Sequence, residues 1–593
     1  MKYCSLDSEA SYTKGSHDIG TYGTHGYVFH SETKHYLVSL WTNDWNYVGR
    51  WEDAPLHRLQ DCTLVSHNRS YDSMVAARMA PQLLNLPWEC SADLAAYCQL
   101  PRALKQAAQV GLGVKMDKDV RDKMSGKDPD GMVSEFMTEC RTYALKDAEV
   151  CFNLWNKFQS NWPEHERQLS RHTTMMGQRG IGIDVEALQR ARSSLKLQLH
   201  EIQSKVPWFG EQDVKGKDIP LMSPKALGRE CQKLGIPAPL STAKTSPEFD
   251  RWLVEYSERA PFVKAMGLLR SCNRTVEIVE AMERRRVGGN LPYNLKYAGA
   301  PHTLRFSGDS GLNMQNFPRK PVSFSETHPE VDLRALLVPR PGYVFIGADY
   351  AQIEARVLLW LAGDERMLKL LASGMDIYEA HARATMGYKD PRPLKEVDPG
   401  MRQISKIRTL GLGFGMGARK FKDFYLTSLG TAITLEQAQS IVTGYRNSNQ
   451  QIVRLWSKLQ QGIQQTSLHE RGQAFKMFLP SRRAIHYFNV HEQEGLRGQK
   501  VQGGPELWWH GALATENCVQ GTARDILAHA ILNLENAGIP VVLHVHDEVL
   551  CEVPEDRAQE GLEAVKEIME KLPEWAEGIP LTADARILRC YGK

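Results

Sequence analysis

Two acidic motifs lie beside strand-like segments in the C-terminal half of the chain. Asp547 and Glu548 interrupt the apolar, β-branched segment 541–553, and this pattern predicts a β-hairpin with two carboxylates at its turn. Asp349 ends a similar apolar run, 343–348. A two-metal phosphoryl-transfer site needs rigidly held carboxylates, because its ions lie about 3.5–4 Å apart. Either motif alone is more typical of a solvated turn. The two motifs together with a third one favour a catalytic site that binds two metal ions.

The third motif lies between these two and repeats every four residues. On a helix, one slanting stripe would hold Arg402, Lys406, Leu410 and Phe414. The two cations suit a triphosphate, and the two apolar groups suit a base and a sugar. Every second residue over 411–417 is glycine, which would let a ligand or another strand approach the backbone. Taken alone, the motif is equally typical of an amphipathic helix with a basic edge.

A second set of polar residues lies in the N-terminal part of the chain. Asp7 and Glu9 are two residues apart, so on a strand both carboxylates point to one face. Tyr143 and Asp147 are four apart and can share a helix face. With Asp72, these residues would hold a second pair of metal ions, and the phenol would orient a water molecule. Acidic residues are common, so the spacing alone is weak evidence.

The three C-terminal motifs resemble the A, B and C motifs of the DNA polymerase I family, which is DNA polymerase family A. They read DYAQIEAR at 349–356, RQISKIRTLGLGFG at 402–415 and HVHDEV at 544–549. The N-terminal set resembles the Exo I, II and III motifs of DnaQ-like 3′→5′ exonucleases, the proofreading domain that precedes the polymerase in this family. All its acidic ligands are present, so we interpret this domain as active.

The resemblance implies an α/β multidomain fold. An RNase H-like exonuclease domain would be followed by a right-hand polymerase with a thumb, a palm built on an antiparallel sheet, and helical fingers. The expected boundaries are 1–160 for the exonuclease, 161–300 for the thumb, 301–365 and 515–593 for the palm, and 366–514 for the fingers. The length of 593 residues is too great for a single core, which agrees with several domains.

The resemblance also implies the roles of the catalytic residues. Asp349 and Asp547, with Glu548 beside them, would hold two Mg²⁺ ions, while Arg402 and Lys406 would bind the triphosphate. Lys406 would also protonate the leaving group. Two further Mg²⁺ ions, with Mn²⁺ as an alternative, would be held in the exonuclease site by Asp7, Glu9, Asp72 and Asp147.

Other residues are expected to contact the nucleotide and the DNA. Nucleotide contacts are expected from Gln352, Glu354, Arg402, Lys406, Leu410 and Phe414, and DNA contacts from Arg305, Gln315, Asn316, Gln520 and His546. Glu354 would be the steric gate that rejects a 2′-hydroxyl. The family usually has tyrosine at the position of Phe414, and its hydroxyl can bond the gate. We therefore expect Glu354 to be held less firmly and ribonucleotides to be rejected less strongly.

Composition narrows the class of protein. The net charge of +3 is too small to indicate nucleic acid by itself. The 11 cysteines include no CxxC pair, which excludes a zinc ribbon and indicates a reducing interior. No apolar run approaches the roughly 18 residues of a membrane span, and a strand-like segment begins almost at the first Met, so we expect no targeting peptide.

These features resemble the bacteriophage replicative branch of the family, because the proofreading domain is short and no 5′-nuclease domain precedes it. We expect a monomer without membrane contact, in the cytoplasm of a host bacterium. Expected partners are primer–template DNA and dNTPs, with a phage helicase-primase or a single-strand binding protein as further candidates.

Two other functions remain open. The chain could be a 3′→5′ exonuclease with a silent polymerase half, which loss of Asp349 or Asp547 would have signalled. It could also be a non-catalytic primer–template binding scaffold, which would not need complete carboxylate sets in two places.

Overall fold

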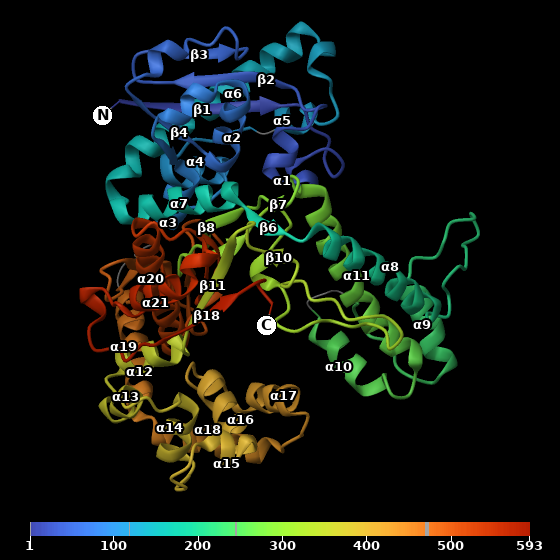
Figure 1. The fold of residues 1–593 in the computed structure, drawn as a ribbon, viewed down its shortest axis with the longest axis vertical. Helices are drawn as coiled ribbons and strands as arrows, with labels where there is room; N and C mark the ends of the chain where they lie inside the picture. The colour runs from blue at the N-terminus through green and yellow to red at the C-terminus, as the bar shows by residue number, and fades with distance from the viewer. Residues whose placement is uncertain (1, 118, 243–245, 469–473, 593) are drawn as a thin grey trace.

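The computed structural model describes residues 2–117, 119–242, 246–468 and 474–592. The N-terminal sheet lies at the top of Figure 1, a second sheet in the middle and a group of helices at the bottom, while a helical arm projects to the right. In the described part of the chain, no helix is both long and apolar enough to cross a membrane.

The N-terminal part is a five-stranded sheet flanked by helices. Its strands have the order β3-β2-β1-β4-β5, in which β1 is antiparallel to β2 and parallel to β4. They are β1 (Lys2–Ala10), β2 (His35–Trp41), β3 (Asn46–Gly49), β4 (Cys62–Ser66) and β5 (Trp88–Cys90). The helices are α1 (Ile19–Val28), α2 (Arg69–Met79), α3 (Ser91–Tyr97), α4 (Leu104–Leu112), α5 (Asp119–Met124) and α6 (Ser134–Phe158). The long helix α6 packs along β1 and β2.

The segment from α7 to α11 is divided between two hydrophobic cores. Its elements are α7 (Glu164–Arg179), β6 (Ile181–Ile183), α8 (Val185–Ser204), α9 (Pro224–Lys233), α10 (Pro247–Tyr256) and α11 (Pro261–Arg285). Leu169 and Met176 of α7 are buried in the central core, and β6 pairs with β7 (Asn290–Leu291) and β10 (Leu337–Val338). By contrast, α8 and α11 pack along each other and carry a separate core near α9 and α10. Only these later helices form the projecting arm (Figure 1).

The central sheet is antiparallel throughout and has the order β16-β17-β11-β18. Its strands are β16 (Val541–Val545), β17 (Glu548–Pro554), β11 (Tyr343–Tyr350) and β18 (Ala583–Leu588), and two more strands, β8 (Leu295–Ala300) and β9 (Arg305–Gly308), form a separate pair. The helices α20 (Gly511–Asn536) and α21 (Ala558–Glu570) pack against the four-stranded central sheet. The hairpin and the strand expected from the apolar runs are therefore confirmed.

The segment between the two parts of this sheet is mostly helical. It contains α12 (Ile353–Ala362), α13 (Glu365–Ala372), α14 (Ile377–Thr385), α15 (Leu394–Val397), α16 (Pro399–Ile407), α17 (Ala418–Leu429), α18 (Leu435–Ser448) and α19 (Gln450–Ser467). The expectation of helical fingers over 366–514 agrees with the structure as far as α19, but it missed the four-stranded sheet that follows this helix. Its strands are β12 (Phe475–Phe478), β13 (Ala484–Glu492), β14 (Leu496–Gln499) and β15 (Glu506–Trp508).

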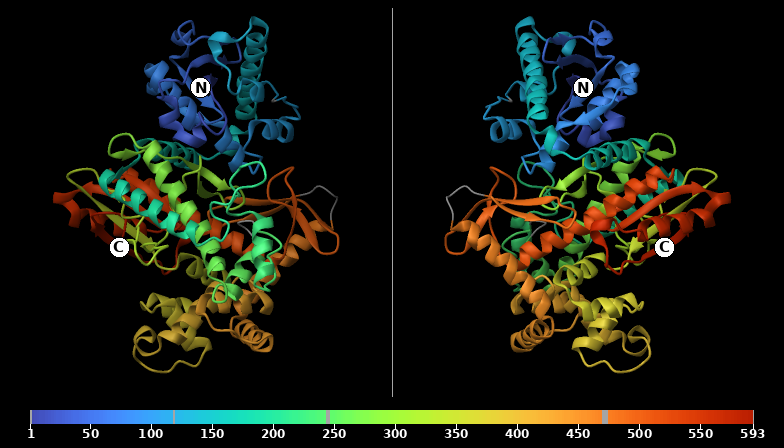
Figure 2. Two further views of the ribbon diagram at one scale, coloured as in Figure 1. Left: turned by 90° about the vertical axis from the view of Figure 1, so that its right-hand side faces the viewer. Right: turned by 90° about the vertical axis from the view of Figure 1, so that its left-hand side faces the viewer.

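Three strands of this additional sheet, β12 to β14, alternate between buried and more accessible side chains, whereas β15 is exposed. Ile485 and Tyr487 of β13 are fully buried, and they pack with α19 and α20. Figure 2 shows the sheet, in orange, projecting at one side of the molecule between the N-terminal part and the lower helices.

Candidate active site

Three carboxylates meet on one face of the central sheet. Asp349 of β11 lies directly opposite Glu548 of β17 on one side and Asp584 of β18 on the other. Directly opposed residues of antiparallel strands point to the same face, so these side chains are neighbours. Asp584 was not singled out from the sequence, because no pattern there reveals which strand pairs with β11.

Asp547 joins this group from the tight turn between β16 and β17. Val545 pairs with Glu548, so only His546 and Asp547 form the turn, and His546 adopts a left-handed backbone conformation with φ of 57°. The backbone oxygen of Asp547 accepts a hydrogen bond from the Tyr350 N–H at 3.2 Å, which ties the turn to β11. The turn and the strand therefore hold the two aspartates beside each other, as the sequence predicts.

The electrostatics of this pair favour a bound cation. Burial, and after it the neighbouring Asp349 carboxylate, raise the pKa of Asp547 to about 7. Burial also raises the pKa of Asp349. Asp349 Oδ1 is buried and has no hydrogen-bond partner among the described residues. Two buried carboxylates resist simultaneous ionisation unless positive charge compensates them, so this group fits divalent metal ions.

Glu548 is held differently from the two aspartates. The Tyr591 hydroxyl donates a hydrogen bond to Glu548 Oε2 at 2.9 Å, and Arg334 Nη1 lies 3.7 Å from the same oxygen. The Arg334 guanidinium also stacks on the Tyr591 ring at 4.6 Å. Tyr591 and Arg334 are far from the motifs in sequence, and they leave Glu548 less free than Asp349 to bind a metal.

A pocket of about 310 Å³ adjoins the aspartates. It brings together five residues that the sequence analysis singled out, namely Arg305, Gln315, Glu354, His546 and Asp547. It adds Phe306, Ala523 and Arg524, which no sequence pattern indicated, and Ile353 and His544, which lie within the quoted motifs but were given no role. The Gln315 side-chain amide donates to the His544 backbone oxygen at 3.3 Å, which fixes one wall of the pocket.

Glu354 has a partner that the sequence analysis did not foresee. The Arg305 guanidinium pairs with its carboxylate, and both side chains remain about one-third exposed, at 30% and 34%. Phe414 has no hydroxyl and packs against the central core instead. Arg305 therefore supplies the polar contact to Glu354 that Phe414 cannot make.

The stripe from Arg402 to Phe414 does not lie on one α-helix. The helix α16 ends at Ile407, and residues Arg408–Leu412 form a π-helical turn before the glycine-rich segment. The wider turn and the left-handed Gly415, with φ of 80°, break the four-residue repeat. The expectation of a continuous stripe is therefore wrong beyond Lys406. Leu410 is 44% exposed on this π-helical turn.

The two cations of α16 have different environments. Arg402 donates to Asp376 Oδ2 at 2.8 Å and lies 5.0 Å from the centre of the Tyr378 ring. Lys406 is half-buried and forms no ion pair within 4.0 Å with any residue in the described ranges. Lys406 is thus the cation that is ready for an anion, whereas Arg402 would first have to leave Asp376.

Three further residues that were expected to contact the nucleotide or the DNA do not line the pocket. Gln352 precedes α12 in a left-handed conformation, with φ of 49°. Asn316 is exposed, and the Gln520 side chain on α20 donates to Glu516 Oε1 at 3.1 Å. These three residues are not among those that line the described pocket.

The N-terminal carboxylates also converge. The Ser5 hydroxyl donates to the Ala148 backbone oxygen at 2.6 Å, so the face of β1 that carries Ser5 and Asp7 points to α6. Tyr143 and Asp147 are buried residues of α6, and Asp72 of α2 accepts a hydrogen bond from Ser8 at 2.7 Å.

The charges of this second group interact strongly. Burial raises the pKa of Asp7 well above its usual value, and Glu9, Asp147 and Asp72 raise it further. Burial likewise raises the pKa of Asp72 to about 7. Asp7 Oδ2 is buried without a hydrogen-bond partner in the described part of the chain. The group therefore fits divalent cations for the same reason as the first one.

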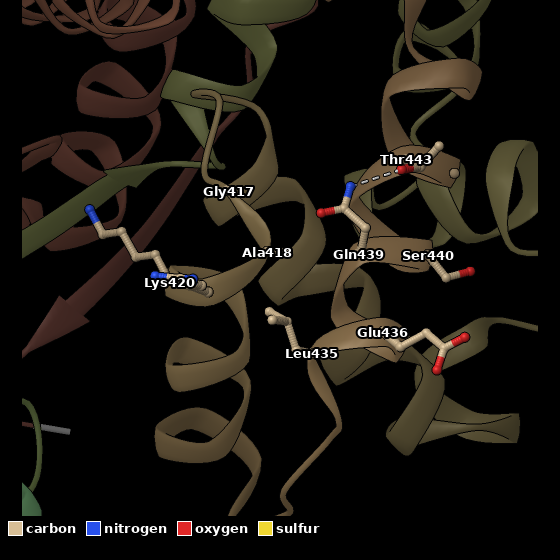
Figure 3. Close-up of a pocket in the computed structure, with 10 residues that line it drawn as sticks. Gly417, Ala418, Lys420, Leu435, Glu436, Gln439, Ser440 and Thr443 are labelled. Carbon is tan, nitrogen blue, oxygen red and sulfur yellow. Dashed lines mark hydrogen bonds between the residues drawn. The ribbon is translucent and has the colours of Figure 1, made fainter.

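A second cavity is lined by none of the carboxylates of either group. It is an open cleft of about 1230 Å³ between α17 and α18, in the lower helices of Figure 1. Figure 3 shows its lining, in which the Gln439 side chain donates to Thr443 Oγ1 at 3.2 Å. Among the described residues that line the cleft, Glu436 is the one acid and lies with Arg419 and Lys420, so the lining lacks the paired acids needed for metal chemistry.

Comparisons with known proteins identify relatives over most of the chain. Residues 185–593 match the model of the family described as DNA polymerase family A. The DNA polymerase of Bacillus phage SP02 is 27% identical, and the alignment covers 89% of each chain. The thermostable DNA polymerase I of Thermus aquaticus is also 27% identical, over 78% of this chain and 53% of its own length. The chain thus spans about half of that bacterial relative.

A solved structure shares the fold. It is the POL domain of Pol1 from M. smegmatis in complex with DNA primer–template and dNTP. The similarity has a TM-score of 0.68 at 17% sequence identity and covers 100% of this chain and 95% of the other.

Proposed function

Because the chain belongs to DNA polymerase family A, we propose that it catalyses DNA-templated DNA synthesis at the carboxylates of the central sheet. The observation that carries this proposal is the pairing of Asp349 and Asp547 on a strand and a tight turn that are hydrogen-bonded to each other. The test is extension of a labelled primer on a template with Mg²⁺ and four dNTPs. Lack of any extension by the purified chain would overturn the proposal.

The carboxylates and the two cations of α16 have different roles in this reaction. Family A DNA polymerases use divalent metal ions, generally Mg²⁺; when bound, such ions acidify the primer 3′-hydroxyl and neutralise the triphosphate. Asp349 and Asp547 would hold two of them, and Glu548 would stay beside them, restrained by Tyr591. Lys406 and Arg402 would neutralise the triphosphate from α16, and Lys406 would donate a proton to the leaving pyrophosphate.

The pocket would receive the nascent base pair. Arg305, Gln315 and His546 line it beside Asp547, and we assign them, with Asn316 and Gln520, to DNA contacts. Leu410, Phe414 and Gln352 would lie around the incoming nucleotide with Glu354. The M. smegmatis structure contains primer–template and dNTP, which supports these two partners for the present chain.

We further propose a 3′→5′ proofreading exonuclease in the N-terminal part. Its support is the convergence of Asp7, Asp72, Asp147 and Tyr143 from β1, α2 and α6. Two Mg²⁺ ions would be bound there, and Tyr143 would orient the attacking water. Arg121, which the sequence analysis did not single out, lies close enough for its charge to favour ionised Asp7, although burial and the other carboxylates outweigh it.

We assign each part of the fold to one of the expected domains as a proposal. The N-terminal sheet would be the exonuclease domain, α8–α11 the thumb, the central sheet the palm and α13–α18 the fingers. The similarity to the SP02 polymerase over 89% of both chains supports a replicative role for a phage in its bacterial host. A helicase-primase or a single-strand binding protein would be a partner in that role. A silent polymerase half or a binding scaffold is less well supported, since both acidic sets are complete.

Replacing Lys406 by alanine is expected to reduce kcat/KM for dNTP incorporation roughly ten- to hundredfold, because one charge-assisted contact to the triphosphate is lost. The Kd for primer–template should stay nearly unchanged. Arg402→Ala should act in the same direction. Single-nucleotide incorporation kinetics and fluorescence anisotropy measure the two quantities.

Lys395→Ala provides the matched control, since Lys395 is an exposed lysine on the neighbouring helix α15 and should leave both quantities unchanged. If Lys406→Ala weakened primer–template binding as much as incorporation, α16 would contact the duplex instead of the nucleotide.

Replacing Arg305 by alanine is expected to weaken sugar selection. The Arg305–Glu354 pair is about one-third exposed, so we discount it to about 1 kcal/mol, which corresponds to roughly a fivefold change. The ratio of kcat/KM for dCTP and CTP should fall by that factor, in addition to any loss shared by both substrates. Arg305→Lys retains a donor and should restore part of the ratio. An unchanged ratio in Arg305→Ala would mean that Arg305 does not position Glu354.

A further inference from the structure

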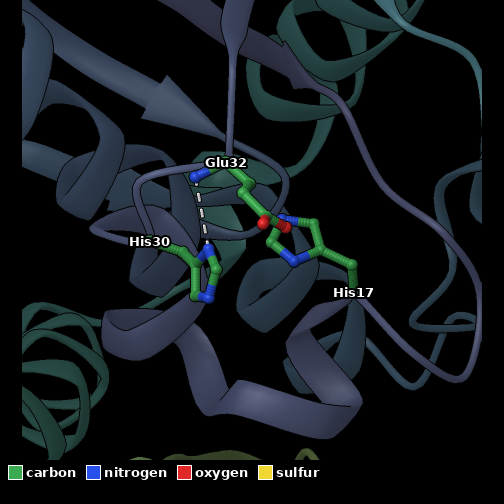
Figure 4. A group of neighbouring side chains, drawn as sticks. All are labelled: His17, His30 and Glu32. Atoms are coloured by element: carbon green, nitrogen blue, oxygen red, sulfur yellow. Dashed lines mark hydrogen bonds between the residues drawn. The ribbon is translucent and has the colours of Figure 1, made fainter.

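Two histidines and a glutamate lie close together beside the short helix α1, away from both sets of acidic residues. They come from the segments that precede and follow this helix. His17 precedes the helix, while His30 and Glu32 follow it. The helix kinks at Gly23, where the backbone φ is 70°. Each of the three side chains offers a ligand atom, and these atoms all lie within 4.8 Å of one another. Figure 4 shows the group.

Backbone hydrogen bonds fix both segments that carry these residues. Thr13 and His17 exchange two backbone hydrogen bonds, at 2.9 and 2.8 Å, which closes a small loop after β1. The Thr33 N–H donates to the His30 backbone oxygen at 3.2 Å and closes a turn before β2. The ligand atoms are therefore presented by folded backbone rather than by free chain ends.

The hydrogen bonds of His17 leave one ring nitrogen available. The Thr33 hydroxyl donates its only proton to the Tyr27 backbone oxygen at 2.7 Å. It must therefore accept at its 2.9 Å contact with His17 Nε2, so that Nε2 carries the proton. The Nδ1 atom of His17 then has a free lone pair. A metal-bound imidazole typically donates its other N–H in this way.

The ring of His30 lies against that of His17, with 4.7 Å between the ring centres. His30 Nδ1 accepts a hydrogen bond from the Glu32 N–H at 3.2 Å (Figure 4). A cation would take this lone pair in place of the Glu32 N–H, or would bind Nε2 of the other tautomer, and either change loses one neutral hydrogen bond.

The donor set selects the kind of cation. Two imidazole nitrogens and one carboxylate oxygen suit Zn²⁺ and similar transition-metal ions, whereas Mg²⁺ prefers oxygen ligands alone. In a tetrahedral zinc site with bonds near 2.0–2.2 Å, donor atoms lie about 3.4 Å apart. Side-chain rotation, chiefly of the exposed Glu32, would close the remaining gap.

We propose that His17, His30 and Glu32 bind one Zn²⁺ or a similar divalent transition-metal ion, with water as the fourth ligand. The ion joins the two ends of α1. This helix also contacts α11, where Arg285 packs beside Gly23 and donates to the Gly20 backbone oxygen. Metal binding therefore stabilises the junction between the N-terminal sheet and the helical arm. The proposal is independent of the polymerase and exonuclease activities.

The test is zinc binding to the full-length chain in excess Mg²⁺, which occupies the all-carboxylate sites. Isothermal titration with ZnCl₂ should give one more tight site per chain for the wild type than for His17→Ala or His30→Ala. His57→Ala removes an exposed histidine of the same domain and should behave like the wild type. Zn²⁺ should also raise the thermal unfolding midpoint of the wild type and of His57→Ala, but not of His17→Ala.

A milder variant guards against misfolding. Glu32 is exposed, so Glu32→Gln should retain the fold, and its zinc affinity should fall by at least about tenfold. Visible absorption of the Co²⁺-loaded wild type, absent from His17→Ala, would support imidazole coordination. Equal zinc stoichiometry and affinity in the wild type, His30→Ala and Glu32→Gln would overturn the proposal and leave the group as an aromatic surface cluster.

Discussion

An Asp349→Ala variant is expected to lose primer extension by at least about a thousandfold, while its degradation of DNA 3′ ends stays intact. Removing a metal ligand from a phosphoryl-transfer site forfeits several kcal/mol of transition-state stabilisation, and about 4 kcal/mol corresponds to a thousandfold in rate. The neighbouring acids should not compensate. Glu548 is restrained by Tyr591 and Arg334, and Asp584 is exposed on the neighbouring edge strand β18. Single-turnover incorporation with Mg²⁺ measures the loss.

The matched control is Asp556→Ala, which removes an exposed aspartate just beyond the end of β17 and should extend primers like the wild type. Asp547→Ala should reproduce the defect of Asp349→Ala, because the two carboxylates act as one unit. Extension by Asp349→Ala within tenfold of the wild type would remove this aspartate from the catalytic centre.

An Asp7→Ala variant is expected to show the opposite pattern. Degradation of a mismatched 3′ end should fall by at least about a thousandfold for the same reason, and correct extension should continue. Asp7 is electrostatically coupled to the rest of its group, since Glu9, Asp147 and Asp72 all raise its pKa. Gel analysis of a labelled mismatched primer without dNTPs measures degradation.

Asp61→Ala serves as the control for this variant, because Asp61 is an exposed aspartate of the same domain. Unchanged degradation by Asp7→Ala would contradict the assignment of the exonuclease site. Loss of extension in the same variant would indicate that the two sites are not separable.

The elements that carry the paired acids were predictable because their signals are local. Period-2 apolar runs around Asp349 and Asp547 specify strands, and the spacing of Asp7 and Glu9 specifies one strand face. Tyr143 and Asp147 likewise share the α6 face that meets β1. In these places, local pattern and tertiary packing favour the same structure.

The remaining features depend on contacts between distant residues. A four-residue repeat predicts one stripe through Phe414, but the backbone widens into a π-helical turn after Ile407, where the glycines remove the constraint of side chains. The Arg305–Glu354 pair and the Tyr591–Glu548 hydrogen bond join segments that no periodicity relates. The sheet β12–β15 forms because α19 and α20 bury one of its faces.

The central claim is that one chain carries two separate metal-dependent sites, one for synthesis and one for excision. The most direct measurement follows a 5′-labelled primer with one mismatched 3′ nucleotide, annealed to template, with Mg²⁺ and the wild-type chain. We predict shortening of the primer without dNTPs, and excision of the mismatch followed by full extension when dNTPs are present. A primer that is shortened in both conditions and never extended would contradict the account.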